Sequence, residues 1–513
     1  MAITFTTSTS STTVTVNDSS HGALVGDFVT FSSANTGNST LNTQLNAEHE
    51  IITVPTTGTY TITLSDNAAA TLTSAGSADA EYQLNIGINT VVPGDGWGAG
   101  TWGADGWGQA STETAGGGTI RLWSQDNFGE DLIFNQRDGG VFYWDKTLGT
   151  STRAQSLPEL SDQAPIKSRK VIVSERDRHV ICFGANPLTS SIQDRLLVRF
   201  SSQENPFQWI PSATNTAGDL RVGSGSEIVT AVKTRREIII LTDTSVHSMQ
   251  FIGAPFTFGI NQLASNITVR GFNSAVAVGD SVLWMGYDRF YLYDGRVQVI
   301  PCSVRDHVFN DFNETQSEKV YAGVNSAFGE VFWFYPSDSN KLENGGDGEN
   351  DKYVVYNYDQ QIWYVGSLKR SAWLDRGVYQ YPMATDSNLV YNHESGNDND
   401  GTAFTSFIES SPMDIQDGDQ FIFLRRMLPD VSFDNSDTDI SASDKQAVFS
   451  LKAQRSPGGG FVKTSTNTVT PTTELNHLRL RGRSFGLRVE STTPKVNWRL
   501  GTPRVDLRAD GDR

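Results

Sequence analysis

Residues 200–258, FSSQENPFQWIPSATNTAGDLRVGSGSEIVTAVKTRREIIILTDTSVHSMQFIGAPFTF, are the most informative part of this chain about its fold. Within them, EIIILT (237–242) and VHSMQFI (246–252) predict two β-strands, because β-branched and aromatic side chains suit a pleated, half-buried surface. The intervening Asp243-Thr244-Ser245 sequence predicts a turn. Gly, Asn and Pro punctuate the rest of the stretch, and it contains no pair of residues arranged for catalysis. The pattern predicts architecture, not chemistry.

Aromatic β segments recur on both sides of this stretch. Trp209, Met249 and Tyr293 are 40 and then 44 residues apart, a spacing that matches one four-stranded propeller blade. We therefore predict an all-β chain with a β-propeller of about five to seven blades over residues 119–403. A pair of β-sandwiches is the alternative, because the repeat is degenerate and has no signature dipeptide. The recurring segments are 132–145, 180–209, 238–251, 282–294, 331–335 and 353–363.

Two regions precede the predicted propeller. Residues 1–92 are rich in Thr, Ser, Asn and Ala, and their period-two alternation predicts a small, half-solvated β-barrel or sandwich. Residues 93–118 form a glycine-rich run, which predicts a loop or linker because glycine opposes helix formation. Its tryptophans pack either within the chain or against another subunit. They are Trp97, Trp102 and Trp107.

Residues 404–513 predict a C-terminal β region, packed on the propeller, with a basic tail. Leu478 and Leu480 alternate with Arg479 and Arg481, so one strand face is apolar and the other basic. From Arg479 to the end there are nine Lys or Arg residues against four Asp or Glu residues. The basic face meets either solvent, an acidic partner subunit or passing DNA.

Composition limits the classes of function. The 513 residues include 40 basic and 58 acidic side chains, a net charge of −18, which argues against stable DNA binding. Negative charge would suit a channel that DNA passes through, and it would equally serve solubility. The length predicts two to four domains, or one large repeat architecture.

The cysteines and the N-terminus indicate no oxidising compartment and no membrane segment. Cys182 and Cys302 are far apart in sequence, which argues against a disulfide framework and a cysteine zinc site. The sequence MAITFTTSTSSTTVTV has no basic or apolar region of a signal peptide, and no run of about 18 apolar residues occurs. We expect neither secretion nor membrane insertion.

Short motifs for chemistry occur out of context. GAGTWG (98–103) matches a dinucleotide fingerprint but lacks a flanking strand and helix, and GRSFG (482–486) lies between alternating strands, which predicts a hairpin turn around Ser484. The acidic loops NGGDGEND (344–351) and NDNDG (397–401) do not complete a calcium-binding loop. We predict no catalytic residue, no cofactor and no metal site, although a carboxylate pair for glycoside hydrolysis stays open.

Eight longer blocks occur in order between residues 119 and 513. They resemble the tail nozzle proteins of short-tailed bacteriophages (podoviruses), also called tail tubular protein B or packaged-DNA stabilisation proteins. HGALVGDFVTF (21–31) similarly resembles a module inserted in phage tail proteins. The eight blocks are FSSQENPFQW (200–209), TNTAGDLR (214–221), ILTDTSVHSMQFIGAPFTFG (240–259), SVLWMGYDRFYLYDG (281–295), VFNDFN (308–313), EVFWFYPSD (330–338), YVVYNYDQQIWYVG (353–366) and WRLGTPRVDLRADG (498–511).

The resemblance implies a non-enzymatic virion protein, assembled in the host cytoplasm and located in the tail. It implies a homohexameric ring that retains the packaged genome and lets it pass on ejection, with a tail adaptor ring, a tail fibre or spike and double-stranded DNA in transit as partners. Candidate mobile or channel loops contain Trp97, Trp102, Trp107, Asp347 and Glu349. The landmark residues that the resemblance implies are Phe200, Asn205, Pro206, Trp209, Asn215, Asp219, Trp284, Asp294, Trp333, Tyr358, Trp363, Trp498 and Arg504.

A receptor-binding or polysaccharide-binding propeller of a tail fibre, with or without glycosidase activity, is the alternative function. Aromatic side chains such as Trp363 and Trp373 would then stack on sugars instead of packing between blades.

Overall fold

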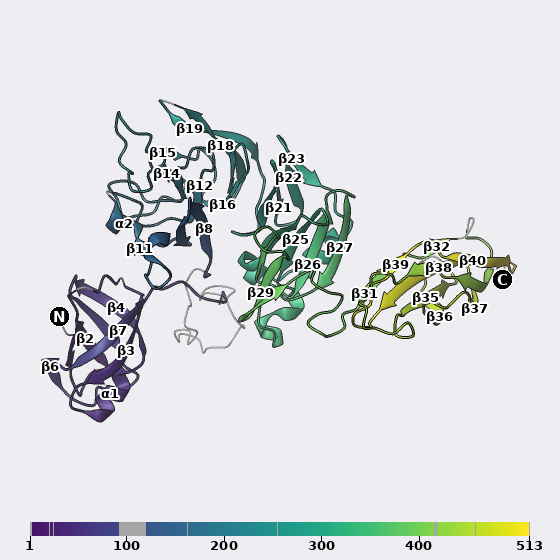
Figure 1. The fold of residues 1–513 in the computed structure, drawn as a ribbon, viewed down its shortest axis with the longest axis horizontal. Coiled ribbons are helices and arrows are strands. Elements are labelled where there is room, and N and C mark those ends of the chain that lie inside the picture. Colours follow the sequence, from purple (N-terminus) through teal and green to yellow (C-terminus); the bar gives the residue numbers. More distant parts are fainter. Residues whose placement is uncertain are drawn as a thin grey trace, which may run out of the picture. The chain divides into compact units, whose positions relative to one another are not determined.

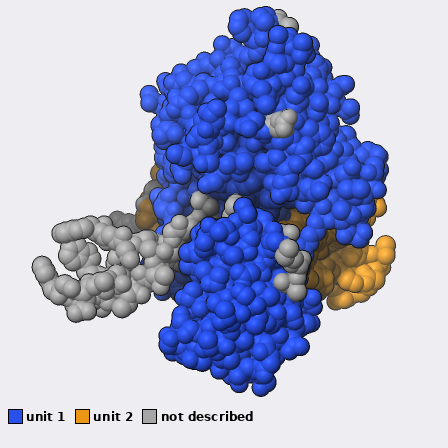
Figure 2. All heavy atoms as spheres, turned by 90° about the vertical axis from the view of Figure 1, so that its left-hand side faces the viewer, with its two compact units in different colours: residues 1–372 blue, residues 373–513 orange. Residues whose placement is uncertain are grey.

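Nearly all of the regular secondary structure described in the computed structural model is β-strand (Figure 1). The structure describes residues 3–511 apart from 20, 24, 92–119, 162, 254, 415–417 and 457. They divide into two compact units, residues 1–372 and 373–513 (Figure 2). The predicted all-β class is confirmed, and the boundary predicted between residues 403 and 404 falls inside the second unit.

The first unit begins with a seven-stranded sheet in the order β6-β1-β2-β5-β4-β3-β7. The alternation seen in the sequence sorts its side chains, because Val14, Val16, Tyr60 and Ile62 are buried in one core while the threonines between them point outward. The elements are β1 (Thr4–Thr7), β2 (Thr13–Asn17), β3 (Phe28–Asn35), α1 (Ser39–Leu45), β4 (Glu48–Thr56), β5 (Thr59–Thr63), β6 (Leu72–Ala75) and β7 (Ser77–Gln83).

Five four-stranded antiparallel sheets follow, each made of strands that are consecutive in sequence and paired in order. This is a β-propeller-like fold, and we number its sheets as blades 1 to 5. Blade 1 contains β8 (Trp123–Phe128), β9 (Asp131–Gln136), β10 (Val141–Trp144) and β11 (Gln155–Ser156); blade 2, β12 (Lys170–Val173), β13 (Val180–Phe183), β14 (Leu197–Phe200) and β15 (Gly218–Arg221); blade 3, β16 (Ile228–Lys233), β17 (Ile238–Thr242), β18 (Ser245–Gly253) and β19 (Thr257–Ser265); blade 4, β20 (Ala275–Val278), β21 (Ser281–Met285), β22 (Phe290–Tyr293) and β23 (Val297–Ile300); and blade 5, β24 (Tyr321–Asn325), β25 (Glu330–Tyr335), β26 (Lys352–Asn357) and β27 (Ile362–Ser367).

Short helical segments connect these strands. The longest of them, η2, precedes blade 5. They are η1 (Lys146–Leu148), α2 (Leu157–Leu160), α3 (Arg305–Phe309), η2 (Glu314–Lys319), η3 (Asp338–Asn340) and η4 (Leu342–Asn344).

The two strands predicted in residues 200–258 are β17 and β18 of blade 3. All five residues of β17 are buried, which an ordinary half-exposed strand would not show. The reason is that both faces of the blade are covered. Ile238 and Ile240 pack in a cluster shared with blade 2, whereas Ile239 and Leu241 pack in a cluster shared with blade 4.

Apolar clusters lie between each consecutive pair of blades. Val171 and Trp209 belong to the cluster of blades 1 and 2, and Trp333 belongs to that of blades 4 and 5. The first strand of each blade also lies beside the first strand of the next, from β8 through β12, β16 and β20 to β24. Burial of apolar side chains between blades therefore stabilises the five-blade array.

The predicted repeat spacing is right for two of its three residues. Met249 and Tyr293 occupy the third strands of blades 3 and 4, at equivalent positions. Trp209 lies instead in the connection between β14 and β15, where its ring is buried and its Nε1 donates to the Pro206 carbonyl at 2.7 Å. An aromatic that packs from a loop looks the same in sequence as one that packs from a strand.

The second unit contains a three-stranded sheet and a β-sandwich. The two sandwich sheets share one core, in which Leu424 and Leu480 of one sheet meet Phe449 and Val489 of the other. The three-stranded sheet is β28 (Ala372–Leu374), β29 (Met383–Asp386) and β30 (Leu389–Asn392); the first sandwich sheet is β31 (Ser406–Glu409), β32 (Met413–Asp414), β38 (Ser484–Ser491), β35 (Ala447–Gln454) and β36 (Phe461–Val469); the second is β37 (Asn476–Gly482), β33 (Ile422–Leu428) and β40 (Arg504–Ala509); and β34 (Val431–Ser432) pairs with β39 (Arg499–Leu500).

The predicted alternation at the C-terminal end is confirmed in β37. Its leucines Leu478 and Leu480 are buried, and Arg479 and Arg481 between them are exposed. The basic face of this tail is therefore a solvent-facing side of the sandwich.

Candidate functional site

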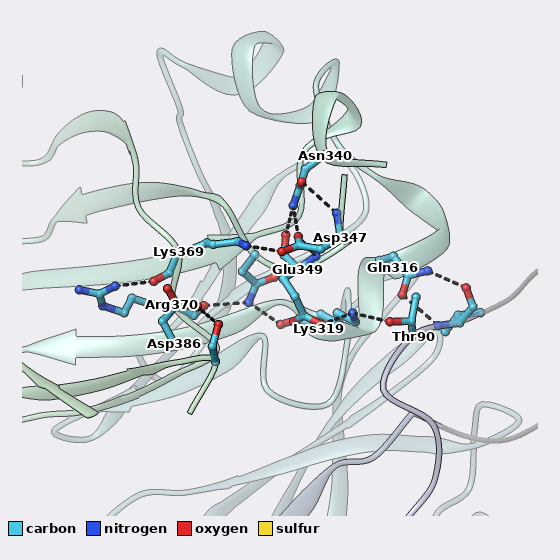
Figure 3. Close-up of polar contacts among 12 residues, drawn as sticks. Thr90, Gln316, Lys319, Asn340, Asp347, Glu349, Lys369, Arg370 and Asp386 are labelled. Atoms are coloured by element: carbon cyan, nitrogen blue, oxygen red, sulfur yellow. Dashed lines mark hydrogen bonds and ion pairs between the residues drawn. The ribbon is translucent and has the colours of Figure 1, made fainter. Parts of the chain in front are cut away.

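The acidic loop that contains Asp347 and Glu349 is held by a dense polar network (Figure 3). Asn340 donates to Asp347 Oδ1 at 2.7 Å and to the Glu349 carbonyl at 2.9 Å. Asp347 forms an ion pair with Lys369, and Glu349 forms one with Lys319 at 2.6 Å. The structure thus places both predicted loop residues in ion pairs within the first unit.

The charge of Asp347 is stabilised by its neighbours. Partial burial raises the pKa of this carboxyl, but hydrogen bonds from Lys369, the Glu349 amide and Asn340 outweigh it and lower the pKa to about 2. Asp347 is therefore ionised throughout the neutral range, and its contacts to the loop persist there.

The same network anchors the segment just before the glycine-rich run. Gln316 of η2 accepts from the Val91 N–H at 3.0 Å and donates to the Val91 carbonyl at 2.7 Å, as a neighbouring strand would. Lys319 donates to Thr90 at 3.4 Å (Figure 3). On the other side of the run, Ile120 forms a parallel bridge with Ile88. Ile88 and Ile120, which precede and follow the predicted loop 93–118, are therefore adjacent; Trp97, Trp102 and Trp107 lie outside the described residues.

Two buried arginines fix η2 to the propeller. Arg270 forms a bidentate pair with Glu314, at 2.6 and 3.0 Å, and its guanidinium lies 4.0 Å from the centre of the Phe312 ring. Arg137 of blade 1 pairs with Glu318 at 2.9 Å. We call η2 with Arg137, Arg270 and the Val91 contact the η2 junction. It joins η2 to blade 1 and blade 4 through charged hydrogen bonds, the strong class of such bonds, and to Val91 through the neutral amide of Gln316.

A second charged cluster comes from the first strands of three consecutive blades. Asp126 of β8 accepts from Lys233 of β16 at 2.9 Å. Lys170 of β12 donates to Thr230 at 2.9 Å, and its ammonium lies 4.8 Å from the centre of the Phe272 ring. Burial lowers the pKa of Lys170 to about 8, and the nearby Asp126 carboxylate opposes this shift. We call this set the axial cluster, because first strands form the inner edge of a propeller.

The landmark residues build the framework instead of meeting in one cleft. Phe200, Trp209, Trp284 and Trp333 are buried between blades. Trp363 packs against Phe290, with ring centres 4.6 Å apart. These aromatics come from blades 2, 4 and 5 and lie in four different interfaces between blades, so each supports the packing around itself.

The other landmarks shape loops and the second unit. Asn205 accepts from the Phe207 amide, and Asn215 accepts from the Ser212 amide, each at 3.0 Å. Asp219 is registered opposite Arg199, and Asp294 accepts from Gln298 at 2.9 Å. The remaining landmarks are Pro206 beside Trp209, Tyr358 against the core of blades 4 and 5, Trp498 donating to Ser406 at 2.8 Å, and Arg504 at the start of β40.

Of the two short motifs, GAGTWG (98–103) lies outside the described residues, and GRSFG (482–486) lies within them. Ser484 begins β38, is buried and donates to Gln454 at 3.0 Å. The predicted hairpin is wrong, because β37 and β38 belong to the two different sheets of the sandwich and do not pair with each other. Ser245 and His247 lie 2.9 Å apart, but both are buried. Across the described part of the chain, no three His, Cys, Asp or Glu side chains gather as a metal site would require, and no helix there is long and apolar enough to cross a bilayer.

One hollow on the first unit lies against a buried charge. It has a volume of about 810 Å³ and is lined by Gln163, Asn186, Thr189 and Arg199 among others. The Arg199 guanidinium donates to the carbonyls of Asn186 (3.2 Å) and Gln163 (2.5 Å), and burial lowers its pKa. The carboxylate of Asp219 opposes this lowering of the Arg199 pKa.

Sequence reasoning missed the η2 junction and the axial cluster. Lys170 begins the apolar run KVIV, and Arg270 follows the apolar sequence NITV, so each is a lone cation beside strand-forming residues. Such a residue is a signal for a buried ion pair. Its partner could not be named from sequence, because Glu314 is far from Arg270 along the chain.

Comparison with known proteins adds only distant structural likenesses. No sequence-family profile and no curated protein matches the chain. One similar solved structure is the extracellular domain of a one-component system from B. thetaiotaomicron, with 9% sequence identity and a TM-score of 0.33; the match covers 53% of this chain and 32% of that one. A second is apo AztD from Citrobacter koseri, with 10% identity and a TM-score of 0.33; the match covers 77% of this chain and 92% of that one. A third is the endosialidase of phage phi92, with 12% identity and a TM-score of 0.21; the match covers 83% of this chain and 65% of that one. The chain thus spans about a third of the first of these, and none of the three supports an argument about function.

Proposed function

We propose that this chain is a structural virion protein that forms the tail nozzle of a short-tailed bacteriophage. The ring of copies would surround the DNA channel, retain the packaged genome and let it pass on ejection. The observation that carries the proposal is the ordered series of sequence blocks that resemble nozzle proteins. Their buried members, such as Trp209, Trp284 and Trp333, pack between blades, as a structural role requires.

The axial cluster bears on where DNA would run. Asp126, Lys170 and Lys233 reach toward one another from the first strands of blades 1 to 3. A duplex would therefore pass between copies of the chain and not along the axis of one propeller. The net charge of −18 supports passage, because few phosphate contacts would form and slow it.

A ring of this kind closes through heterologous contacts repeated around its axis. The η2 junction suits a fixed base for a loop, because η2 holds Val91 with two hydrogen bonds and Thr90 with one. An adaptor ring above and a fibre or spike beside the nozzle would be its other partners.

Electron microscopy of virions labelled on this protein tests the proposal. Label at the distal tip of the tail, around the channel axis, would support it, and label on peripheral fibres would reverse it. Size measurement of the chain mixed with its adaptor gives a second readout, for which six-fold rings are expected. A trimer that binds or cleaves polysaccharide would refute the nozzle assignment.

A receptor-binding or polysaccharide-binding propeller is the second candidate, and the hollow at Arg199 favours it. A buried cation beside a hollow of about 810 Å³ could accept an anionic sugar. The aromatics named for sugar stacking are engaged elsewhere, since Trp363 packs on Phe290 and Trp373 is buried beside His393. Binding of acidic oligosaccharides that is lost in Arg199→Gln, together with a peripheral location, would establish this candidate.

A further inference from the structure

The last strand of the chain leaves one edge of its sheet open. β40 pairs with β33 on one side, and the described residues provide no strand on its other side. The pairing continues past β40, because the Asp510 N–H donates to the Phe421 carbonyl at 2.8 Å. An open edge presents unpaired N–H and C=O groups and acts as a template for another strand.

The apolar side of β40 is also uncovered. Val505 and Leu507 lie on the same sheet face as the buried residues Met427 and Leu424, which are their register partners in β33. They nevertheless remain 41% and 40% exposed. Natural sheets usually protect an open edge with inward charges, proline or a covering segment, and β40 instead offers apolar side chains there.

The sequence of this edge is complementary to itself. Residues 504–510 read RVDLRAD. When a second copy is placed antiparallel with its Leu507 opposite Leu507, Arg504 faces Asp510 of the second copy, and Asp506 faces Arg508 of the second copy. By symmetry, Asp510 faces the second copy's Arg504, and Arg508 faces its Asp506. Four cross-strand pairs of opposite charge result, with Val505 opposite Ala509 on the apolar face.

Backbone geometry permits this register. Since the Asp510 N–H points toward β33, alternation directs the backbone groups of Val505, Leu507 and Ala509 to the open edge. These are the residues that face one another in the register centred on Leu507. A shift by two residues in either direction would place Asp506 opposite Asp506, or Arg508 opposite Arg508. Charge therefore selects one register.

We propose that β40 pairs antiparallel with β40 of a second copy of this chain, about a two-fold axis at Leu507. The two three-stranded sheets then become one six-stranded sheet, and the apolar side chains of both edges are buried. The contact is isologous, because each residue meets its counterpart by the same operation.

The intrachain partners of the two aspartates remain in place. Asp506 accepts from Arg426 at 2.9 Å, and Asp510 forms an ion pair with Arg481. A carboxylate has two oxygens and can accept from two cations, so the arginines of the second copy add to these pairs without displacing them. The paired residues are partly exposed, so they are accessible in the isolated chain.

This pairing is independent of the nozzle proposal. A ring with only a six-fold axis contains no two-fold axis perpendicular to it, so the contact belongs to the free protein or joins separate assemblies. In the free protein it would cover an edge that otherwise favours aggregation.

Sedimentation velocity of the full chain over a range of concentrations tests the pairing. We expect a monomer–dimer equilibrium that Arg508→Asp and Asp506→Arg each weaken about tenfold or more, because each creates two like-charge contacts. Arg236→Asp, at an exposed site in blade 3 outside the interface, is the matched control and should leave association unchanged.

Mixing the two single variants provides the decisive measurement. In the mixed pair, the arginine introduced at position 506 of one chain faces the aspartate introduced at position 508 of the other. The unchanged Arg508 of the first chain faces the unchanged Asp506 of the second, so association should return toward the unmodified level. Recovery also demonstrates that both variants are folded.

Two results would overturn the pairing. One is a chain that stays monomeric at every concentration, and the other is a pair of variants that fail to recover on mixing. Six-fold rings observed without this recovery would refute the pairing and leave the nozzle proposal standing.

Discussion

We predict that His179 makes the interface of blades 2 and 3 sensitive to acid. It precedes β13, is fully buried, and its Nε2 lies 3.0 Å from Thr216 Oγ1. Phenylalanine rings surround it, with the Phe258 and Phe200 centres at 5.1 and 6.3 Å. Burial lowers the pKa of this imidazole to about 4, from the usual 6.5.

The shift defines the sign and size of the effect. Between pH 6.5 and 4 the unfolded chain binds a proton at His179 that the folded chain excludes, so stability is present above this window and is lost as the pH falls through it. A shift of about 2.5 pH units corresponds to roughly 3 kcal/mol. His179→Gln removes the titration and retains a side chain that can bond Thr216.

Hydrogen exchange followed by mass spectrometry, on peptides covering β13, β14 and β18, measures the local free energy of opening in the full chain. Near pH 7 the variant should be less stable than the unmodified protein, because the glutamine fills the site less well. Between pH 7 and pH 4 the free energy of opening should fall by up to about 3 kcal/mol more in the unmodified protein than in the variant. The difference between the two proteins should therefore shrink or change sign near pH 4. A difference that is the same at both pH values would refute the buried neutral imidazole. His307→Gln, a substitution at an exposed histidine, is the control.

Further predictions concern the axial cluster, a blade-interface tryptophan and the thiols. Lys170→Met removes a cation whose folded pKa is lowered to about 8, so unmodified protein should gain stability relative to the variant as pH rises from 8 to 10.5, by at most about 3 kcal/mol in denaturant unfolding. Trp333→Ala should cost about 3–5 kcal/mol in thermal unfolding, since the ring is fully buried, and Trp333→Phe should cost less. Burial raises the pKa of Cys182 to about 12 and of Cys302 to about 11, so a thiol reagent at pH 8 should label both slowly until the protein is unfolded.

The strands were predictable where local pattern decides them, and the charged sites were not. EIIILT predicted β17 because its side chains have no alternative to burial, and the alternation at Leu478 and Leu480 predicted β37 for the same reason. Trp209 was wrongly treated as equivalent to Met249, because periodicity does not distinguish a loop residue that packs inward from a strand residue.

The junction contacts were beyond sequence reasoning because they join distant parts of the chain. The pair of Arg137 with Glu318 exists only once blade 1 and η2 are brought together in space. The acidic loop shows the same limit. Asp347 and Glu349 could be identified as clustered acids, but their partners Lys369 and Lys319 come from segments on either side of that loop.

The blade connectivity has a consequence for how the protein forms during synthesis. Every blade strand pairs with a neighbour in sequence, so each blade can be completed soon after its own residues leave the ribosome. The contact of Arg137 with Glu318 must wait until blades 2, 3 and 4 have been made, and closing that long loop has an entropic cost. A growing chain therefore carries Arg137 on blade 1 without its carboxylate partner until η2 emerges, and during this interval the incomplete propeller is open to misassembly.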